Sequence, residues 1–241
     1  MRHIDSHLVS FTAPASFAAE QYQGLRLAVE RIARTRDVRT IAVSSPAAGD
    51  GKTVTSINLA GALARGSDER VLLVDADLRR PSVAKLLGLT DAKPGLGDIL
   101  ARDGLDAGEA VRHVDRLNLA VLPAGAPRRA GVSDTLRSPR LEALLKELRR
   151  RYSCIVVDTP PLLPVFDSAL LAKLVDGVLL VVAANQTPRK LLGESLNMLD
   201  PAKVLGIVFN RDARPLFGYY NSYSRYYRGY FADSSEVASQ A

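Results

Sequence analysis

Six strand-length runs in this chain of 241 residues are apolar from end to end, and segments with a helical pattern separate most of them. A strand with one solvated face alternates polar and apolar residues, whereas a strand covered on both faces does not. We therefore expect a three-layer α/β fold, with a mostly parallel central sheet and helices on both of its faces. The runs are 40–45, 70–77, 117–125, 153–161, 176–184 and 202–210.

Helices are expected where apolar residues recur at steps of three and four. Their predicted ranges are 18–36, 53–65, 138–152, 168–175 and 187–199, with two short helical patterns inside 81–102. A chain of this length suits one sizeable domain rather than two. We expect an N-terminal arm at 1–17, a single domain at 18–210 and a mobile, tyrosine-rich tail at 211–241.

Composition indicates the compartment in which the chain works. No apolar run reaches the ~18–20 residues of a membrane span, and the N-terminus lacks the apolar core of a signal peptide. The single cysteine, Cys154, rules out an internal disulfide and is expected to be a small core residue. These features predict a cytoplasmic protein. The net charge of +6 suits nucleic acid, an acidic membrane surface or a polyphosphate ligand, but the basic residues are scattered, as on an ordinary solvated surface.

The segment SSPAAGDGKT, residues 44–53, lies between a predicted strand and a predicted helix. In such a loop, successive backbone N–H groups cradle phosphate oxygens, and the helix N-terminus adds a partial positive charge. The usual phosphate-loop spacing, G-x-x-x-x-G-K-[ST], is present except that Pro46 holds the first glycine position. We predict that the loop binds ATP through Ala48, Gly49, Asp50, Gly51, Lys52, Thr53 and Val54.

Four residues of this loop have distinct chemical tasks. Gly49 and Gly51 allow backbone angles and close approaches that a Cβ would block. Lys52 reaches the β- and γ-phosphates as a point charge, and Thr53 offers its hydroxyl to Mg²⁺. ATP and Mg²⁺ are therefore the expected cofactors.

Two further strands end in aspartate, and parallel strands place their carboxyl ends at one edge of a sheet. Asp75 and Asp77 follow VLLV, and Asp158 follows CIVV. Because like charges held close repel, this cluster needs a cation, which Mg²⁺ on the phosphates supplies. We predict that Asp158 orients Mg²⁺ and that Asp75 is a second metal-facing group. Asp77 either shares that face or lies in the following loop, where it would accept the proton of an acceptor hydroxyl.

Six of the eight tyrosines lie between residues 219 and 230, at a spacing that fits neither a strand nor a helix face. We interpret their hydroxyls as acceptors of the γ-phosphoryl group. Each phosphotyrosine carries roughly −1.5 to −2 charges, so six would outweigh the net charge of the chain and could switch self-association. These tyrosines are Tyr219, Tyr220, Tyr223, Tyr226, Tyr227 and Tyr230.

Other interpretations of this cluster stay open. It would also suit an aromatic belt at a membrane interface or a sticky low-complexity segment. A third alternative is a nucleic-acid surface on which bases stack against tyrosines, with Arg225 and Arg228 between them.

Together these motifs resemble the bacterial tyrosine kinases that control capsule and exopolysaccharide synthesis. The similarity covers nearly the whole chain, since VLLVDADLRRP and YSCIVVDTPP match family motifs as the phosphate loop does, and PGLGDIL and LPAG also resemble family sequence. The resemblance implies a P-loop kinase domain that phosphorylates its own tail. The active-site set that it implies is Lys52, Thr53, Asp75, Asp77 and Asp158. By similarity to related P-loop sheets, Asn210 is expected at the adenine edge.

The resemblance also implies partners. Subunits of this family contact one another through an E-x-x-R-x-x-R helix, and here Glu20 and Arg26 match while Gln23 replaces the middle arginine. A homo-oligomer is therefore expected, and a ring is one form of it. Family members work with a membrane-spanning activator, which implies a separate activator of the polysaccharide chain-length type at the inner face of the cell membrane. No specific nucleic-acid partner is expected.

Two rival functions use the same fold and loop. Positioning and partitioning ATPases carry a signature lysine early in the loop, K-G-G-x-G-K-[ST], where this chain has Ala47. A regulator that binds ATP without transferring phosphate would need the same binding residues. The missing lysine and the tyrosine cluster favour the kinase over the positioning ATPase.

Overall fold

A seven-stranded sheet forms the centre of the molecule, in the order β3-β4-β2-β5-β1-β6-β7. The computed structural model describes residues 4–66, 70–89, 94–102, 104–114, 118–128 and 130–212. Neighbouring strands are parallel except β3 and β4, which are antiparallel. The strands are β1 (Thr40–Ser44), β2 (Val71–Asp75), β3 (Arg112–Val114), β4 (Leu119–Leu122), β5 (Cys154–Asp158), β6 (Gly177–Ala183) and β7 (Val204–Asn210).

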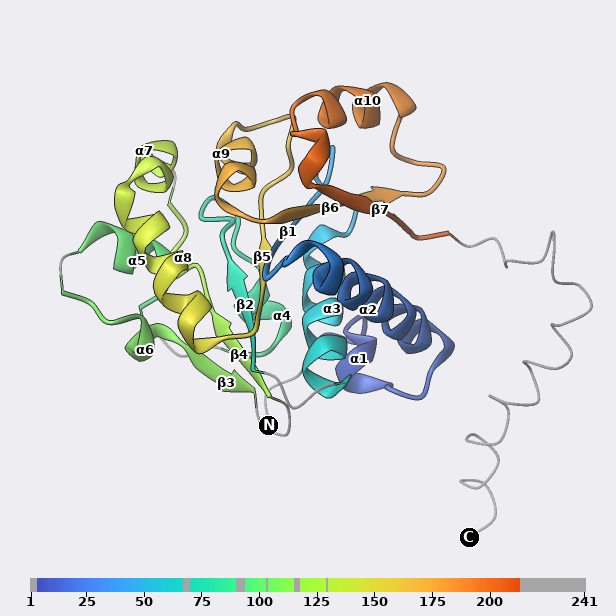
Figure 1. Ribbon diagram of the computed structural model, residues 1–241, viewed down its shortest axis with the longest axis horizontal. Coiled ribbons are helices and arrows are strands. Elements are labelled where there is room, and N and C mark those ends of the chain that lie inside the picture. Colours follow the sequence, from blue (N-terminus) through green and yellow to red (C-terminus); the bar gives the residue numbers. More distant parts are fainter. Residues whose placement is uncertain are drawn as a thin grey trace, which may run out of the picture.

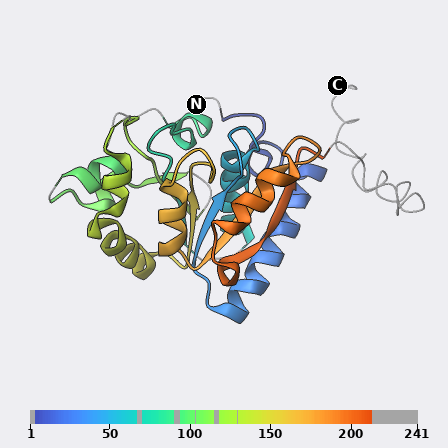
Figure 2. The same cartoon turned by 90° about the horizontal axis from the view of Figure 1, so that it is seen from above.

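Helices cover both faces of this sheet, as the apolar strand runs predict (Figure 1). One apolar cluster joins the sheet to α2 and α3, and the other joins its opposite face to α5, α7, α8 and α9. Figure 2 shows the long helix α2 beside the β7 end of the sheet. The helices are α1 (Val9–Thr12), α2 (Phe17–Arg36), α3 (Lys52–Gly66), α4 (Val83–Leu86), α5 (Leu96–Ala101), α6 (Ala107–Ala110), α7 (Val132–Arg137), α8 (Pro139–Arg151), α9 (Asp167–Leu174), α10 (Arg189–Asn197) and the 3-10 turn η1 (Pro201–Lys203).

Burial separates the central strands from the edge strand. Every residue of β1, β2, β4 and β6 is buried, which explains why these runs contain no alternating polar residues. β7 is an edge strand, and its side chains Ile207 and Phe209 are 38% and 67% exposed. The three-layer fold predicted from the sequence is therefore confirmed. Among the described helices, none is both long and apolar enough to cross a membrane.

The N-terminal segment departs from the expected arm. Its described part, residues 4–16, contains α1 and packs on α3, where Leu8 is fully buried. The side chain of Asn58 on α3 accepts the Ser10 N–H at 2.9 Å and donates to the His7 carbonyl at 3.0 Å. The Ser10 hydroxyl donates in turn to the Asn58 carbonyl at 2.9 Å. A helix of one turn has too few residues to show a period, so the sequence could not reveal it.

Other differences concern short elements and strand ends. The sequence did not predict β3, because its three residues Arg-His-Val carry no apolar run, and it did not predict α6 or α7. The predicted strands 70–77 and 153–161 end earlier, at Asp75 and Asp158. Asp77 therefore lies in the loop after β2 and not on the strand.

Asn58 provides a test of the docked N-terminal segment. Asn58→Ala removes side-chain bonds from buried backbone groups, so we expect the free energy of unfolding to fall by about 2–4 kcal/mol. Urea unfolding of the full chain measures this change. The control is Asn197→Ala, at an exposed position on α10, which should stay within about 0.5 kcal/mol of the native value. Equal stability of the two variants would contradict the docking.

Candidate active site

The phosphate loop connects β1 to α3, which begins at Lys52. Gly49 and Gly51 have φ angles of 93° and 94°, in the left-handed region that favours glycine. A Cβ on Gly51 would also overlap the side-chain amide of Asn210. Both glycines are therefore required by the conformation of the loop, as the sequence pattern predicts.

Side chains from outside the loop hold it in place. The Asp50 carboxylate accepts the Ala47 N–H at 3.0 Å and the Thr187 hydroxyl at 2.7 Å. The Asn210 amide donates to the Asp50 carbonyl at 2.9 Å. Asp50 therefore fastens the loop to the ends of β6 and β7, a task that its position in the motif did not indicate. The predicted contact of Asn210 with adenine stays a prediction.

Asp158 lies at the base of the loop and is fully buried. Its two carboxylate oxygens accept the Thr53 hydroxyl at 2.8 Å and the Ser56 hydroxyl at 2.9 Å. These bonds fix the rotamer of Thr53, whose hydroxyl is the group that a phosphate loop offers to Mg²⁺. Ser56 lies one turn into α3 and was not among the residues predicted from the sequence.

Asp75 stands directly opposite Asp158 in the register of β2 and β5. It is buried, and its oxygens accept three backbone N–H groups, from Asp77 at 3.2 Å and from Ser82 and Val83 at 3.1 Å each. These bonds shape the loop that carries Asp77 from β2 to α4. The observed contacts of Asp75 are thus with backbone, and its predicted role toward the metal stays a prediction.

Asp77 faces Lys52 across the site. The ammonium of Lys52 lies 3.3 Å from the Asp77 carboxylate and 3.2 Å from the Thr53 hydroxyl. The other Asp77 oxygen accepts the Arg80 N–H at 2.9 Å, so its carboxylate is held toward the site. The predicted convergence of Lys52, Asp75, Asp77 and Asp158 at one sheet edge is therefore observed.

Buried carboxylates make the electrostatics of this edge unusual. Burial and the nearby Asp158 raise the pKa of Asp75 to about 8, and burial also raises the pKa of Asp158. Burial opposes the charge on Lys52, but Asp158 and Asp77 outweigh it and raise the Lys52 pKa. Lys52 thus provides the cation that offsets the negative charge of Asp158 and Asp77.

This donor set suits Mg²⁺ held together with phosphates. Among the described residues, no group of three or more His, Cys, Asp or Glu is placed to hold a metal ion by itself. Mg²⁺ does not need such a cage, because it usually binds one or two protein oxygens, substrate phosphates and water. The Thr53 hydroxyl, oriented by Asp158, fits that requirement.

A cleft of about 460 Å³ opens beside the loop. Arg79, Arg80 and Arg211 line it together with Pro160, Pro161, Pro164 and Val165. Arg79 is anchored by Asp167, whose Oδ2 accepts its Nε–H at 2.6 Å. No role was predicted for these lining residues, because prolines and arginines after a strand are common in loops. The six tail tyrosines lie outside the described residues.

The fold and site define a P-loop nucleotide-binding protein, and comparison with known proteins gives its family. The family profile described as AAA domain matches residues 38–200, so the chain belongs to that family. The VpsO kinase domain superposes with a TM-score of 0.69 at 34% identity, over 81% of this chain and 99% of that one. The septum site-determining protein MinD of Pyrococcus horikoshii OT3, complexed with Mg-ADP, has a TM-score of 0.61 at 27% identity, over 74% and 72%.

Curated relatives give a consistent result. The tyrosine-protein kinase YwqD of Bacillus subtilis (strain 168) is 28% identical, over 90% of this chain and 92% of that protein. The succinoglycan biosynthesis transport protein ExoP of Rhizobium meliloti (strain 1021) is 31% identical over 88% of this chain, which spans only 27% of ExoP. The resemblance to bacterial tyrosine kinases found in the sequence is therefore confirmed. Membership of a P-loop family implies nucleotide binding with a metal ion.

The raised pKa of Asp75 predicts how stability varies with pH. In the folded, nucleotide-free chain Asp75 holds its proton up to about pH 8, whereas an unfolded carboxyl loses it near pH 4. Folding therefore takes up a proton between these values, so stability falls as the pH rises from about 5 to 8, by at most about 1.4 kcal/mol per pH unit. Urea unfolding at several pH values measures this slope.

Two variants identify the group responsible. Asp75→Asn cannot titrate and should flatten the slope, whatever its effect on the absolute stability. Asp37→Asn, at the exposed end of α2, should keep the native slope. An unchanged slope in Asp75→Asn would show that another group binds the proton.

Proposed function

We propose that this chain is an ATP-dependent protein-tyrosine kinase that phosphorylates its own C-terminal tyrosine cluster and so regulates capsule or exopolysaccharide synthesis or export. The observation that carries the proposal is that Asp77 and Lys52 meet at the mouth of a phosphate loop, in a chain whose relatives are tyrosine kinases. The cleft beside them is lined by both side chains and opens to solvent, where an acceptor side chain can enter.

Each group has a task in this transfer. Lys52 holds the β- and γ-phosphates, and the Thr53 hydroxyl holds Mg²⁺, which supplies positive charge for the phosphates when bound. The phenol oxygen of tyrosine attacks the γ-phosphorus, the bond from that phosphorus to the β–γ bridging oxygen breaks, and ADP leaves. Asp77 takes the phenol proton, since its carboxylate lines the cleft and lies in the loop after β2.

Arginines on the cleft wall suit the phosphate groups of ATP. Arg79 keeps its position through Asp167, which also accepts the Ser133 hydroxyl at 2.7 Å. Its guanidinium and that of Arg80 border the cleft, where they would attract phosphate oxygens. Arg80 thus adds positive charge beside Lys52, whereas Arg79 is neutralised by Asp167 and contributes N–H donors.

The proposal includes partners that the relatives suggest. ExoP is described as a transport protein and is far longer than this chain, which favours a membrane partner or a fused membrane segment for kinases of this type. We propose a separate membrane-spanning activator, which would hold this chain at the inner face of the membrane. Self-association would use α2, where Glu20 is exposed. Arg26 instead bonds Gln23 and Glu30 within the helix, at 2.9 Å and 2.8 Å.

A positioning ATPase is the second candidate, favoured by the similarity to MinD. Both functions bind MgATP at the same edge of the same sheet. They differ in the fate of the γ-phosphate, which a positioning ATPase transfers to water and a tyrosine kinase transfers to tyrosine. Incubation with MgATP and the activator, followed by mass spectrometry of residues 219–230, separates them. Hydrolysis without phosphotyrosine would favour the positioning ATPase, and nucleotide binding with neither outcome would favour a regulator.

Asp77→Asn tests the proposed base. The variant keeps the phosphate loop and Lys52, so we expect ATP affinity within about tenfold of the native value. Phosphotyrosine formation should fall by about 10²–10⁴-fold, because the phenol proton loses its acceptor. Nucleotide titration and quantified phosphotyrosine give the two readouts, with Lys52→Met as the inactive reference. Near-native transfer by Asp77→Asn would refute this assignment.

Replacing the six tail tyrosines with Phe tests whether the tail is only a substrate. The active site lies in the described domain, so the variant should still phosphorylate an added tyrosine peptide within about threefold of the native rate, a change of less than 1 kcal/mol in barrier. Phosphate transfer to the peptide is the measurement. Loss of that activity would mean that the tail is part of the catalytic structure.

A further inference from the structure

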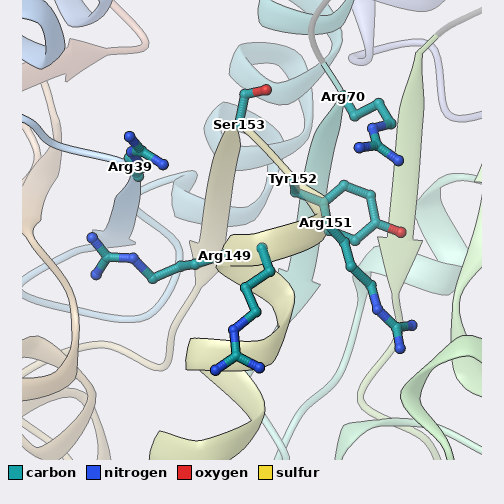
Figure 3. A pocket seen from close by; sticks show the side chains of 7 residues that line it. Arg39, Arg70, Arg149, Arg151, Tyr152 and Ser153 are labelled. Carbon is teal, nitrogen blue, oxygen red and sulfur yellow. The ribbon is translucent and has the colours of Figure 1, made fainter.

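Five arginines surround a hollow of about 370 Å³ (Figure 3). It lies at the N-terminal ends of the strands, whereas the phosphate loop lies at their C-terminal ends. We call it the arginine pocket. Its position follows from the chain, since these residues precede the strands whose far ends carry the catalytic groups. The arginines are Arg39, Arg70, Arg149, Arg150 and Arg151.

The backbone of this pocket is fixed by the sheet. Arg39 and Arg70 stand immediately before β1 and β2, which flank β5. The carbonyl of Arg70 accepts the Ser153 N–H at 3.0 Å, and that of Arg39 accepts the Ile155 N–H at 2.7 Å. The two arginines are thus held on either side of the start of β5. Their backbone positions therefore need no reorganisation when a ligand binds, and only the side chains adjust.

Arg149, Arg150 and Arg151 form the last turn of α8. Cations at a helix C-terminus offset its partial negative charge, which by itself would explain three arginines there. It does not explain Arg39 and Arg70, which lie outside α8 and line the same hollow. The partial charge at the C-terminus of α8 therefore does not account for all five arginines.

Charge balance in the pocket is incomplete. Three of the guanidinium groups pair with carboxylates, Arg149 with Asp176 at 2.9 Å, Arg151 with Glu147 at 2.7 Å and Arg39 with Asp37 at 3.4 Å. Within the part of the chain that the structure describes, Arg70 and Arg150 have no ion-pair partner. The pocket therefore keeps excess positive charge and donors for an anion.

An aromatic ring and a hydroxyl complete the lining. Arg70 and Arg151 lie on opposite sides of the Tyr152 ring in Figure 3. Burial raises the pKa of Tyr152, although Arg151 and Arg70 act in the other direction, so its hydroxyl is neutral at physiological pH and can donate a hydrogen bond. Ser153 is exposed beside it. The hollow therefore offers guanidinium forks, hydroxyl donors and an aromatic surface.

We propose that the arginine pocket binds phosphotyrosine from the distal tail of the same chain, at Tyr226, Tyr227 or Tyr230. The inference rests on the proposed function, which supplies the phosphate. A phosphotyrosine carries a near-dianionic group that guanidinium forks bind in bidentate fashion, and a ring that stacks on Tyr152 and on arginine planes. An acidic membrane surface needs positive charge but neither a hollow nor an aromatic wall, so it accounts for fewer of these features.

The length of the tail favours the distal tyrosines. The pocket lies three strands across and one strand length away from the end of β7, which is roughly 25–30 Å at ~4.8 Å per strand and ~3.3 Å per residue. An extended chain from Asp212 covers at most about 25 Å to Tyr219 but about 50 Å to Tyr226. Tyr219 therefore reaches at most the near limit of this distance, whereas Tyr226 and the tyrosines after it reach the pocket with ample slack.

Binding there would move a phosphorylated tail away from the catalytic edge. The cleft beside Lys52 would then be free for another acceptor.

The test uses a fluorescent peptide of residues 218–230, synthesised with phosphate on Tyr226, Tyr227 and Tyr230, and the unphosphorylated full chain without ATP. Fluorescence anisotropy should show the phosphopeptide binding at least tenfold more tightly than the unphosphorylated peptide. The double variant Arg70→Ala/Arg150→Ala removes the two unpaired guanidinium groups and should weaken binding at least tenfold. The control Arg102→Ala/Arg189→Ala, at exposed positions elsewhere, should change affinity less than twofold.

Three results would overturn the proposal. The first is that both peptides bind equally well. The second is that the two double variants weaken binding equally while their unfolding stabilities match. The third is that the pocket binds phosphatidylglycerol vesicles but not the phosphopeptide. Because the peptide carries its phosphate from synthesis, the result is independent of kinase activity. A chain that binds the phosphopeptide but never forms phosphotyrosine would refute the proposed function alone, and an active kinase that fails to bind it would refute the pocket alone.

Discussion

The register of β2 against β5 is the constraint on which the site depends, because it sets Asp75 directly opposite Asp158. Two buried carboxylates so close together oppose each other's charge, and the structure compensates in two ways. Asp75 satisfies its oxygens with backbone N–H groups, whereas Asp158 takes hydroxyl donors from α3. The remaining carboxylate, that of Asp77, pairs with Lys52 and lines the cleft.

The phosphate loop is held by residues at the ends of β6 and β7. Asn210 at the end of β7 and Thr187 after β6 bond Asp50 through its carbonyl and its carboxylate. β7 is an edge strand with exposed side chains, but its last residue, Asn210, holds the phosphate loop. This arrangement links the conformation of the phosphate loop to β7, the strand that directly precedes the tail.

Much of this was accessible from the sequence, for identifiable reasons. Uninterrupted apolar runs predict a sheet buried on both faces, and glycines before Lys52 predict the loop, because both signals are local. The role of Asp75 in shaping the following loop was not accessible, since it depends on three N–H groups placed by tertiary structure. The arginine pocket was equally hidden, because its members lie far apart in sequence and only strand order brings them together.

Arg211 borders the cleft, so the segment that carries the tyrosines begins on the rim of the site. Under the proposed function, an acceptor tyrosine tethered by about ten residues experiences an effective concentration in the millimolar range, whatever the concentration of the protein. Such a kinase needs little intrinsic affinity for its acceptor. Selection can therefore leave the acceptor sequence loose, with several tyrosines among Gly, Ser and Arg, as long as the tether stays short.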